Sequence, residues 1–250
     1  MQRLARKDEV SGFDRRNEYF LHEVDHILNL MKTNAITSDD DKPKSQSIEI
    51  MLCQAFNSLM RLRLENPFES IDSFLIRVNE MFPNGLFHEE TDIVLTGLYS
   101  SVGIKQRLRR GKFQYDSRTN VTQGHFITAK LDLRTSKVTF IDSLNQDITK
   151  SSYFDFPLLA RLFTDVYECI MTLKKKKPIA LQFDQQMMKR QMASDCGLHL
   201  LVNSELWLRN FRPENQYFRD EDIKRIRHYH YLLCEQKVKT FKLDLIDSSS

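Results

Sequence analysis

The chain has 250 residues, of which 41% are hydrophobic and 28% are charged, and its 37 basic and 34 acidic residues leave a formal net charge of +3. This composition can bury a hydrophobic core, and it excludes a largely disordered or low-complexity protein. The charge balance is too even for a dedicated nucleic-acid-binding protein, so nucleic acid is not expected among the partners.

The distribution of charged residues and cysteines predicts an intracellular protein, in the nucleus or the cytoplasm. Residues 1–20 are charged throughout and lack the apolar stretch of a signal peptide, and no uncharged stretch is long enough for a transmembrane helix. The four cysteines are far apart and form no CxxC pair, which favours reduced thiols. None of the seven glycines builds a GxGxxG or GxxxxGK(S/T) motif, so a nucleotide-binding loop is not expected.

The first hundred residues are expected to be helical. Apolar residues recur there at spacings of three and four, and a polar, Asp-rich loop over residues 37–47 separates the first helix from the rest. The predicted helices of this half cover residues 19–32, 48–64, 68–81 and 89–102.

In the second half, predicted strands alternate with predicted helices. Residues 125–133 and 137–142 alternate in hydrophobicity on either side of an Arg-Thr-Ser turn, which is typical of a β-hairpin. An apolar run over residues 179–183 predicts a buried strand. A helical half followed by this alternation predicts an α+β fold. The predicted helices of this half cover residues 156–173, 197–211 and 220–234.

Cys196 has the sequence context of a catalytic thiol. It stands in the segment Asp195-Cys196-Gly197, directly before a predicted apolar helix. A thiol at the N-terminus of a helix lies at the positive end of the helix dipole, which stabilises the thiolate. Gly197 permits the close approach of an acyl group. The backbone N–H groups around Cys196 provide part of an oxyanion hole, with a nearby Gln side chain as a further donor.

His125 and Asp142 are placed to complete a catalytic triad. His125 opens the first strand of the predicted hairpin, and Asp142 closes the second strand, 17 residues later. In an antiparallel pair these positions fall nearly opposite each other on one face, where Cβ atoms are about 5 Å apart. A carboxylate at that distance can orient an imidazole that acts as the base for a cysteine nucleophile.

These motifs, in the order His, Asp, Gln, Cys, resemble those of the ubiquitin-like-protein proteases. That family includes the Ulp/SENP enzymes, which cleave SUMO from its conjugates, and the adenovirus-type maturation proteases. The resemblance covers about residues 87–211 and implies a mixed central sheet between helices. By this likeness Cys196 is the nucleophile, His125 the general base and acid, Asp142 the residue that orients it, and Gln191 the oxyanion donor. The motifs are His125-Phe126, Phe140-Ile141-Asp142-Ser143-Leu144, Gln191 and Asp195-Cys196-Gly197.

Two positions depart from the family pattern. Gln191 stands five residues before the cysteine, where the family usually has six or seven, so Gln185 and Gln186 are alternative oxyanion donors. Phe126 follows the histidine, where SUMO-type enzymes carry a Trp that clamps the Gly-Gly tail of the modifier. Phe126 is therefore expected to line the substrate site, and the single tryptophan, Trp207, lies downstream of the cysteine.

The activity implied by this resemblance is hydrolysis of the C-terminal Gly-Gly linkage of a ubiquitin-like modifier (SUMO, NEDD8 or ubiquitin) or of its protein conjugates, without a metal or cofactor. The peptidase domain is expected over residues 81–242, after a helical N-terminal region of residues 1–80 and before a polar tail of residues 243–250. Three alternatives remain open: a maturation protease of a virus or mobile element that cuts polyprotein sites, an acyltransferase, and an inactive binding module that retains the peptidase fold.

His22 and His26 form a competing motif. The segment from His22 to His26 matches HExxH on a predicted helix, which is the ligand pair of zinc proteases with Glu23 as the base. No further ligand follows at metzincin spacing, and Asp25 adds a charge where such enzymes keep an uncharged residue. Chance occurrence is therefore the expected explanation.

Other polar and reactive side chains are expected to have structural roles. Asp195 is expected to cap the helix that follows it, and His199 to pack within that helix. The clusters Lys105–Lys112 and Lys174–Lys177 are expected at solvated helix ends. The remaining cysteines lie on apolar helix faces and are expected in the core: Cys53, Cys169 and Cys234.

Overall fold

The structure is a computed structural model that describes residues 21–37, 47–100, 105–109, 112–116, 125–151, 153–187, 195–208 and 220–234. None of the described helices is long and apolar enough to cross a membrane. In chain order the elements are α3 (Leu21–Thr37), β1 (Ile48–Met51), α4 (Cys53–Glu65), α5 (Ile71–Met81), β2 (Ile93–Ser100), β3 (Lys105–Arg109), β4 (Lys112–Asp116), β5 (His125–Asp132), β6 (Lys137–Ile141), η2 (Ile148–Lys150), α6 (Phe156–Leu173), β7 (Gln182–Gln186), α7 (Cys196–Leu208) and α8 (Asp220–Cys234).

Five strands form a mixed sheet in the order β1-β2-β5-β6-β7. The two outer pairs, β1 with β2 and β6 with β7, are parallel, whereas β2 with β5 and β5 with β6 are antiparallel. Strands β3 and β4 form a separate antiparallel hairpin. Because β5 runs opposite to β2 and β6, the start of β5 lies at the same end of the sheet as the ends of its two neighbours.

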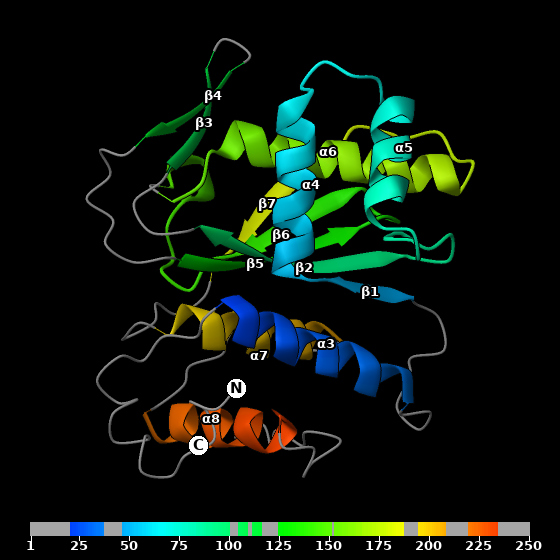
Figure 1. The fold of residues 1–250 in the computed structure, drawn as a ribbon. Coiled ribbons are helices and arrows are strands. Elements are labelled where there is room, and N and C mark those ends of the chain that lie inside the picture. The colour runs from blue at the N-terminus through cyan, green and yellow to red at the C-terminus, as the bar shows by residue number, and fades with distance from the viewer. Residues whose placement is uncertain are drawn as a thin grey trace.

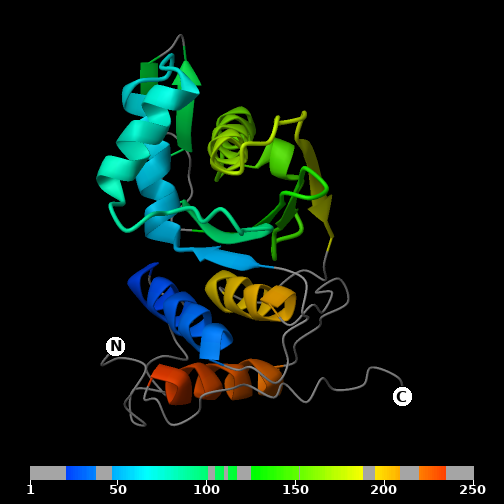
Figure 2. The same ribbon diagram turned by 90° about the vertical axis from the view of Figure 1, so that its right-hand side faces the viewer.

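Helices cover both faces of the sheet (Figures 1 and 2). Helices α4, α5 and α6 pack on one face, and α3 and α7 pack on the other, with α8 outside them. Each face has its own hydrophobic core: Phe56, Phe140 and Phe163 lie in the first, and Ile27 and Leu201 in the second. This arrangement confirms the expected α+β fold with a mixed central sheet between helices.

Five expected helices and one strand pair are confirmed. The helices predicted from residues 19, 68, 156, 197 and 220 onward appear as α3, α5, α6, α7 and α8, and the predicted hairpin appears as β5 and β6. Two features that favour a helix start stand at the beginning of α6. Asp155 accepts a hydrogen bond from the Leu158 N–H at 3.2 Å, and proline stands in the first turn.

Two helices expected in the first half are wrong in part. Residues 48–51 form strand β1 before α4 begins, and residues 93–100 form β2 in the middle of the expected helix 89–102. Strand β2 lies between β1 and β5, and its residues from Ile93 to Leu98 are buried. A strand buried on both faces has consecutive apolar residues, and such a run does not distinguish a strand from a helix.

Residues 1–80 are therefore not purely helical. Strand β1 pairs with β2, and α4 and α5 share a hydrophobic core with the later helix α6. The domain boundary after residue 80 stays a prediction. Residues 1–20, most of the polar loop at 37–47 and the tail at 243–250 lie outside the described residues.

Two further segments, one on each side of the β5–β6 hairpin, also differ from expectation. The strand predicted over residues 179–183 forms three residues later as β7, which is at the edge of the sheet, and Ile179 is 65% exposed. The cluster Lys105–Lys112 contributes to the β3–β4 hairpin rather than to a helix end. Its cations at positions 105, 107 and 109 have the period of two that is typical of a strand. Lys174, by contrast, ends α6 as expected.

The glycine of β2 allows two helices to approach the sheet closely. A Cβ atom added at Gly97 would meet the Sγ atom of Cys53 in α4, and would lie 2.6 Å from Cδ1 of Leu200 in α7. Both neighbours are buried in the core beneath α3 and α7. Gly97 therefore sets how near the first turn of α4 and the middle of α7 lie to the sheet.

We expect Gly97→Ala to destabilise the protein by about 1–3 kcal/mol, because overpacking a buried site forces neighbouring side chains from their positions. Chemical denaturation measures this change. The matched control is Cys53→Ala, alone and combined with Gly97→Ala; removal of the sulfur atom should recover part of the lost stability in the double variant. An equal loss in Gly97→Ala with and without Cys53→Ala would contradict the proposed contact.

Candidate active site

The His125 side chain lies at the end of the sheet where β2 and β6 finish. His125 is the first residue of β5 and pairs with Ser100 of β2, while Asp142 directly follows β6. Thr128 pairs with Ile141, so an extension of this register places Asp142 opposite Ile127 rather than His125. The two residues are thus diagonal neighbours on one face of the sheet. Asp142 is opposite the residue two positions after His125, whereas the sequence placed the two side chains nearly opposite each other.

A short hydrogen bond joins these two side chains. Nε2 of His125 lies 2.7 Å from Oδ1 of Asp142, with the histidine 2% exposed and the aspartate fully buried. The Leu144 N–H donates to the same Oδ1 at 2.8 Å, and the Asn145 N–H donates to the Asp142 carbonyl at 2.8 Å. The turn after β6 therefore holds the carboxylate in place, and the carboxylate orients the imidazole.

Cys196 brings the third group to His125 from another part of the chain. It is the first residue of α7 and is partly exposed, whereas the following residues of this helix are buried. The Cys196 side chain hydrogen-bonds the imidazole of His125. With Nε2 engaged by Asp142, the other ring nitrogen, Nδ1, is the one left for the sulfur. The structure thus brings together the three residues that the sequence singled out, from β5, the end of β6 and the start of α7.

The electrostatics of this group favour a protonated imidazole. Burial acts to lower the pKa of His125, but hydrogen bonds to Asp142 and Cys196 and their negative charges outweigh it and raise the pKa from 6.5 to about 9. The raised pKa of His125 therefore increases the free energy of unfolding. This contribution is complete below pH 6.5 and is lost as the pH rises through about 9. At neutral pH the site therefore holds an imidazolium beside Asp142 and Cys196.

The three candidate oxyanion glutamines have different positions. Gln191 lies outside the described residues. Gln185 braces the turn after β6: its Oε1 accepts from the Ile148 N–H at 2.7 Å, and its Nε2 donates to the Gln146 carbonyl at 2.5 Å. This use inside the fold argues against Gln185 as an oxyanion donor.

Gln186 is the other described candidate. It pairs with Ile141 in β6, next to Asp142, and Ile141 packs in the core on the α7 side of the sheet. Among the described residues its buried Nε2 atom has no hydrogen-bond partner. Gln186 therefore retains an unused donor beside the last residue of β6.

Phe126 does not have the position expected of a residue that lines the substrate site. It is 3% exposed and packs in the core, with its ring centroid 4.6 Å from that of Tyr99. The cause is the pleat of β5, since neighbouring residues of a strand point to opposite faces and His125 uses the other face. Gly197 is buried in the first turn of α7, directly after Cys196.

Tyr153 is a residue at the site that the sequence did not reveal. Its ring packs on the imidazole of His125 with centroids 4.6 Å apart, and the residue is partly exposed. Burial, followed by the charges of Cys196 and Asp142, raises the pKa of its hydroxyl. The buried Ser151 fixes this segment by accepting from the Tyr153 N–H at 3.1 Å. No motif marks Tyr153, because the loop that carries it is positioned by tertiary contacts.

The HExxH segment has a structural use. Asp25 accepts hydrogen bonds from the N–H groups of Cys53 at 2.7 Å and Gln54 at 2.9 Å, and so caps α4, whose own N-cap residue offers no side-chain bond. His22 is exposed. Within the described part of the chain, no group of three or more His, Cys, Asp or Glu side chains is arranged to hold a metal ion.

The residues assigned structural roles are mostly buried, as expected. His199 is buried in α7, and burial lowers its pKa to about 4. The Asp195 side chain pairs with Arg227 of α8, a contact that the sequence did not predict. The cysteines other than Cys196 form no disulfide bond; two are buried and the last is partly exposed: Cys53, Cys169 and Cys234.

Comparison with known proteins identifies the fold. No protein-family model and no curated protein matches the sequence. The SUMO protease Ulp1 with its catalytic cysteine oxidised to a sulfonic acid superimposes with a TM-score of 0.52 at 15% identity, over 85% of this chain and 78% of that chain. The C-terminal protease domain of Ulp1 in complex with Smt3, the yeast ortholog of SUMO, gives a TM-score of 0.51 at 15% identity, over 85% and 76%. The chain therefore has a Ulp/SENP-like protease fold, as the sequence motifs implied.

We expect Asp142→Asn to lower the pKa of His125 from about 9 to about 6.5 or below, because the substitution removes a charge and leaves the burial of the imidazole in place. NMR titration of the histidine ring signals measures this. Asp184→Asn is the control, since Asp184 is an exposed carboxylate on β7 that pairs with Lys137. A His125 pKa that stays near 9 in Asp142→Asn would show that the carboxylate does not control the imidazole.

Proposed function

We propose that the chain is a cysteine peptidase, a thiol isopeptidase that hydrolyses the C-terminal Gly-Gly linkage of a ubiquitin-like modifier. The observation that carries this proposal is the buried hydrogen-bonded series from Asp142 through His125 to Cys196, on a Ulp/SENP-like fold. The series has the three parts that a cysteine nucleophile needs: a thiol, a base beside it, and a group that orients the base.

In the first half of the proposed reaction, the Cys196 thiolate attacks the carbonyl carbon of the terminal glycine. In this proposal the imidazolium of His125 holds the proton that the thiol gives up, and the pKa of His125, about 9, supports an imidazolium at neutral pH. As the tetrahedral intermediate collapses, the imidazolium gives this proton to the nitrogen of the leaving amine, and the C–N bond breaks. The products are a free amine and a thioester between Cys196 and the modifier.

In the second half, water replaces the amine. Neutral His125 takes a proton from water, the hydroxide attacks the thioester carbonyl, and the C–S bond breaks to restore the thiolate and the imidazolium. Asp142 keeps the imidazole oriented through its hydrogen bond to Nε2. Atoms and charges balance with these side chains and one water molecule.

The negative oxygen of each intermediate requires hydrogen-bond donors. The first N–H groups of α7 have no partner within the helix, and they begin at Cys196 itself. We assign the side-chain donor to Gln191, the candidate closest to the cysteine in sequence, with Gln186 as the alternative because of its unused Nε2 donor.

The modifier class rests on the fold and the motifs. The Ulp1 structure with Smt3 is a complex of a protease of this fold with a ubiquitin-like protein. Gly197, directly after Cys196, has no side chain that could block an extended substrate tail from reaching the cysteine. SUMO, NEDD8 and ubiquitin share that kind of tail, and the choice among them is open to direct test.

One observation favours a second candidate function. Phe126 is buried in the core, and Trp207 lies near the other end of α7, where Lys130 packs over its ring at 5.0 Å. Neither residue provides the Trp clamp of SUMO-type enzymes. A maturation protease of a virus or mobile element, which cuts Gly-containing polyprotein sites, does not require such a clamp.

We expect Cys196→Ser to abolish covalent labelling by a ubiquitin-like modifier that carries a C-terminal electrophile, because the hydroxyl is a far weaker nucleophile than the thiolate. A panel of SUMO, NEDD8, ubiquitin and Gly-Gly peptide probes, followed by intact-mass measurement, tests the class and the modifier together. Labelling by the peptide probe alone would support the maturation protease.

The matched control is Cys169→Ser, since Cys169 is buried in α6 and burial raises the pKa of its thiol to about 12. This variant should label like the wild type. Labelling that survives Cys196→Ser and disappears in Cys169→Ser would overturn the assignment. Activity that is lost with a chelator but not with iodoacetamide would favour the HExxH alternative.

A further inference from the structure

A buried ion pair connects the last residue before the nucleophile to the C-terminal helix. Nη2 of Arg227 in α8 contacts Oδ1 of Asp195, and the two side chains are 12% and 2% exposed. Asp195 directly precedes Cys196, and its carbonyl accepts from the His199 N–H at 3.0 Å, the first backbone bond of α7. The same residue thus starts the helix and carries a buried carboxylate one position from the thiol.

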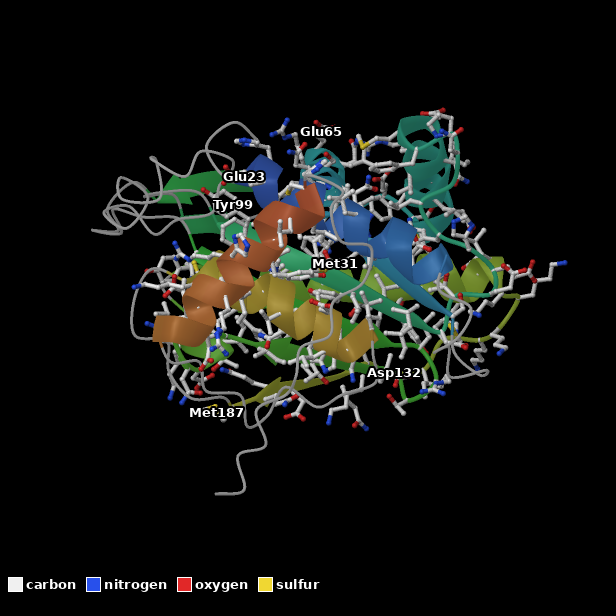
Figure 3. The ribbon with its side chains drawn as sticks, turned by 90° about the horizontal axis from the view of Figure 1, so that it is seen from below. Glu23, Met31, Glu65, Tyr99, Asp132 and Met187 are labelled. Carbon is white, nitrogen blue, oxygen red and sulfur yellow. The ribbon has the colours of Figure 1, made fainter. Side chains whose placement is uncertain are left out.

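Helix α8 holds Arg227 in a fixed position. Ile226, Tyr229 and Leu233 of this helix are buried in the core that α7 and α3 also form. Figure 3 shows α8 lying across α7 and α3, and Figure 2 shows the same layer from the side. The guanidinium that contacts Asp195 therefore belongs to a helix that is packed against the core.

The charge of Asp195 has a chemical consequence for the nucleophile. A buried carboxylate without a partner is costly, and a negative charge beside a thiolate disfavours the ionised form of the thiol. The positive charge of Arg227 offsets both effects. Arginine suits this task because it stays protonated in a buried position and binds carboxylates with fixed geometry.

We propose that Arg227 is a positioning residue for the nucleophile: its ion pair with Asp195 fixes the turn that begins α7 and offsets the charge of the carboxylate one residue before Cys196. The inference rests on the proposed function, in which Cys196 is the attacking group. Helix α8 contributes none of the triad residues, but through Arg227 it would help to position the nucleophile.

The test is the rate at which iodoacetamide alkylates Cys196 in the full chain, followed at neutral pH by mass spectrometry of the peptide that contains this residue. Arg227→Gln should slow the reaction about tenfold, because the negative charge of Asp195, no longer offset by Arg227, then disfavours ionisation of the thiol. Arg227→Lys, which keeps the charge, should stay within about threefold of the wild type. The double variant Asp195→Asn/Arg227→Gln should recover most of the rate, because it removes both charges.

The remaining cysteines report folding in the same samples. Cys234 lies two turns after Arg227 in α8, so faster alkylation there would indicate that α8 has detached, and faster alkylation of the buried Cys169 would indicate global unfolding. A Cys196 rate that is unchanged in Arg227→Gln, or a double variant as slow as the single one, would overturn the inference. Wild-type Cys196 that reacts no faster than Cys234 would instead count against the proposed function.

Discussion

The site depends on a balance of buried charges at one end of the sheet. His125 and Asp142 are almost entirely shielded from water, and a buried imidazolium or carboxylate alone would be strongly disfavoured. Their hydrogen bond at 2.7 Å, together with the Cys196 side chain, reverses the effect of burial on the imidazole and keeps it charged. The imidazole stays charged because Asp142 and Cys196 are both present, so the proposed chemistry and the local stability share one cause.

The fold supplies these groups from three elements that the sheet topology brings together. The antiparallel partners of β5 place the start of that strand beside the end of β6, and the turn after β6 is braced by Gln185 of the edge strand β7. Helix α7 runs between the sheet and α8, so its first turn is fixed from both sides (Figure 2). The Asp195–Arg227 ion pair adds a link from that turn to the outer helix. Rigid elements thus set the positions of all three side chains.

The sequence indicates most of the candidate site and less of the fold. Cys196 and His125 are recognisable because each stands at the end of an element with a clear hydrophobic pattern, and such ends do not require knowledge of long-range packing. The sequence of strand β2 resembles that of a helix because a strand buried on both faces loses its alternation. Phe126 lies in the core because neighbouring residues of β5 point to opposite faces of the sheet. No local pattern marks Tyr153 or Arg227, since both reach the candidate site through tertiary contacts.

The proposed mechanism requires an ion pair between Cys196 and His125 in the resting protein. Ultraviolet absorbance of the thiolate, compared between the wild type and a variant without the Cys196 sulfur, measures this directly across the pH range. The account predicts a thiolate signal at neutral pH that depends on both Cys196 and His125 and that does not require substrate. Identical spectra for the two proteins at neutral pH would contradict it.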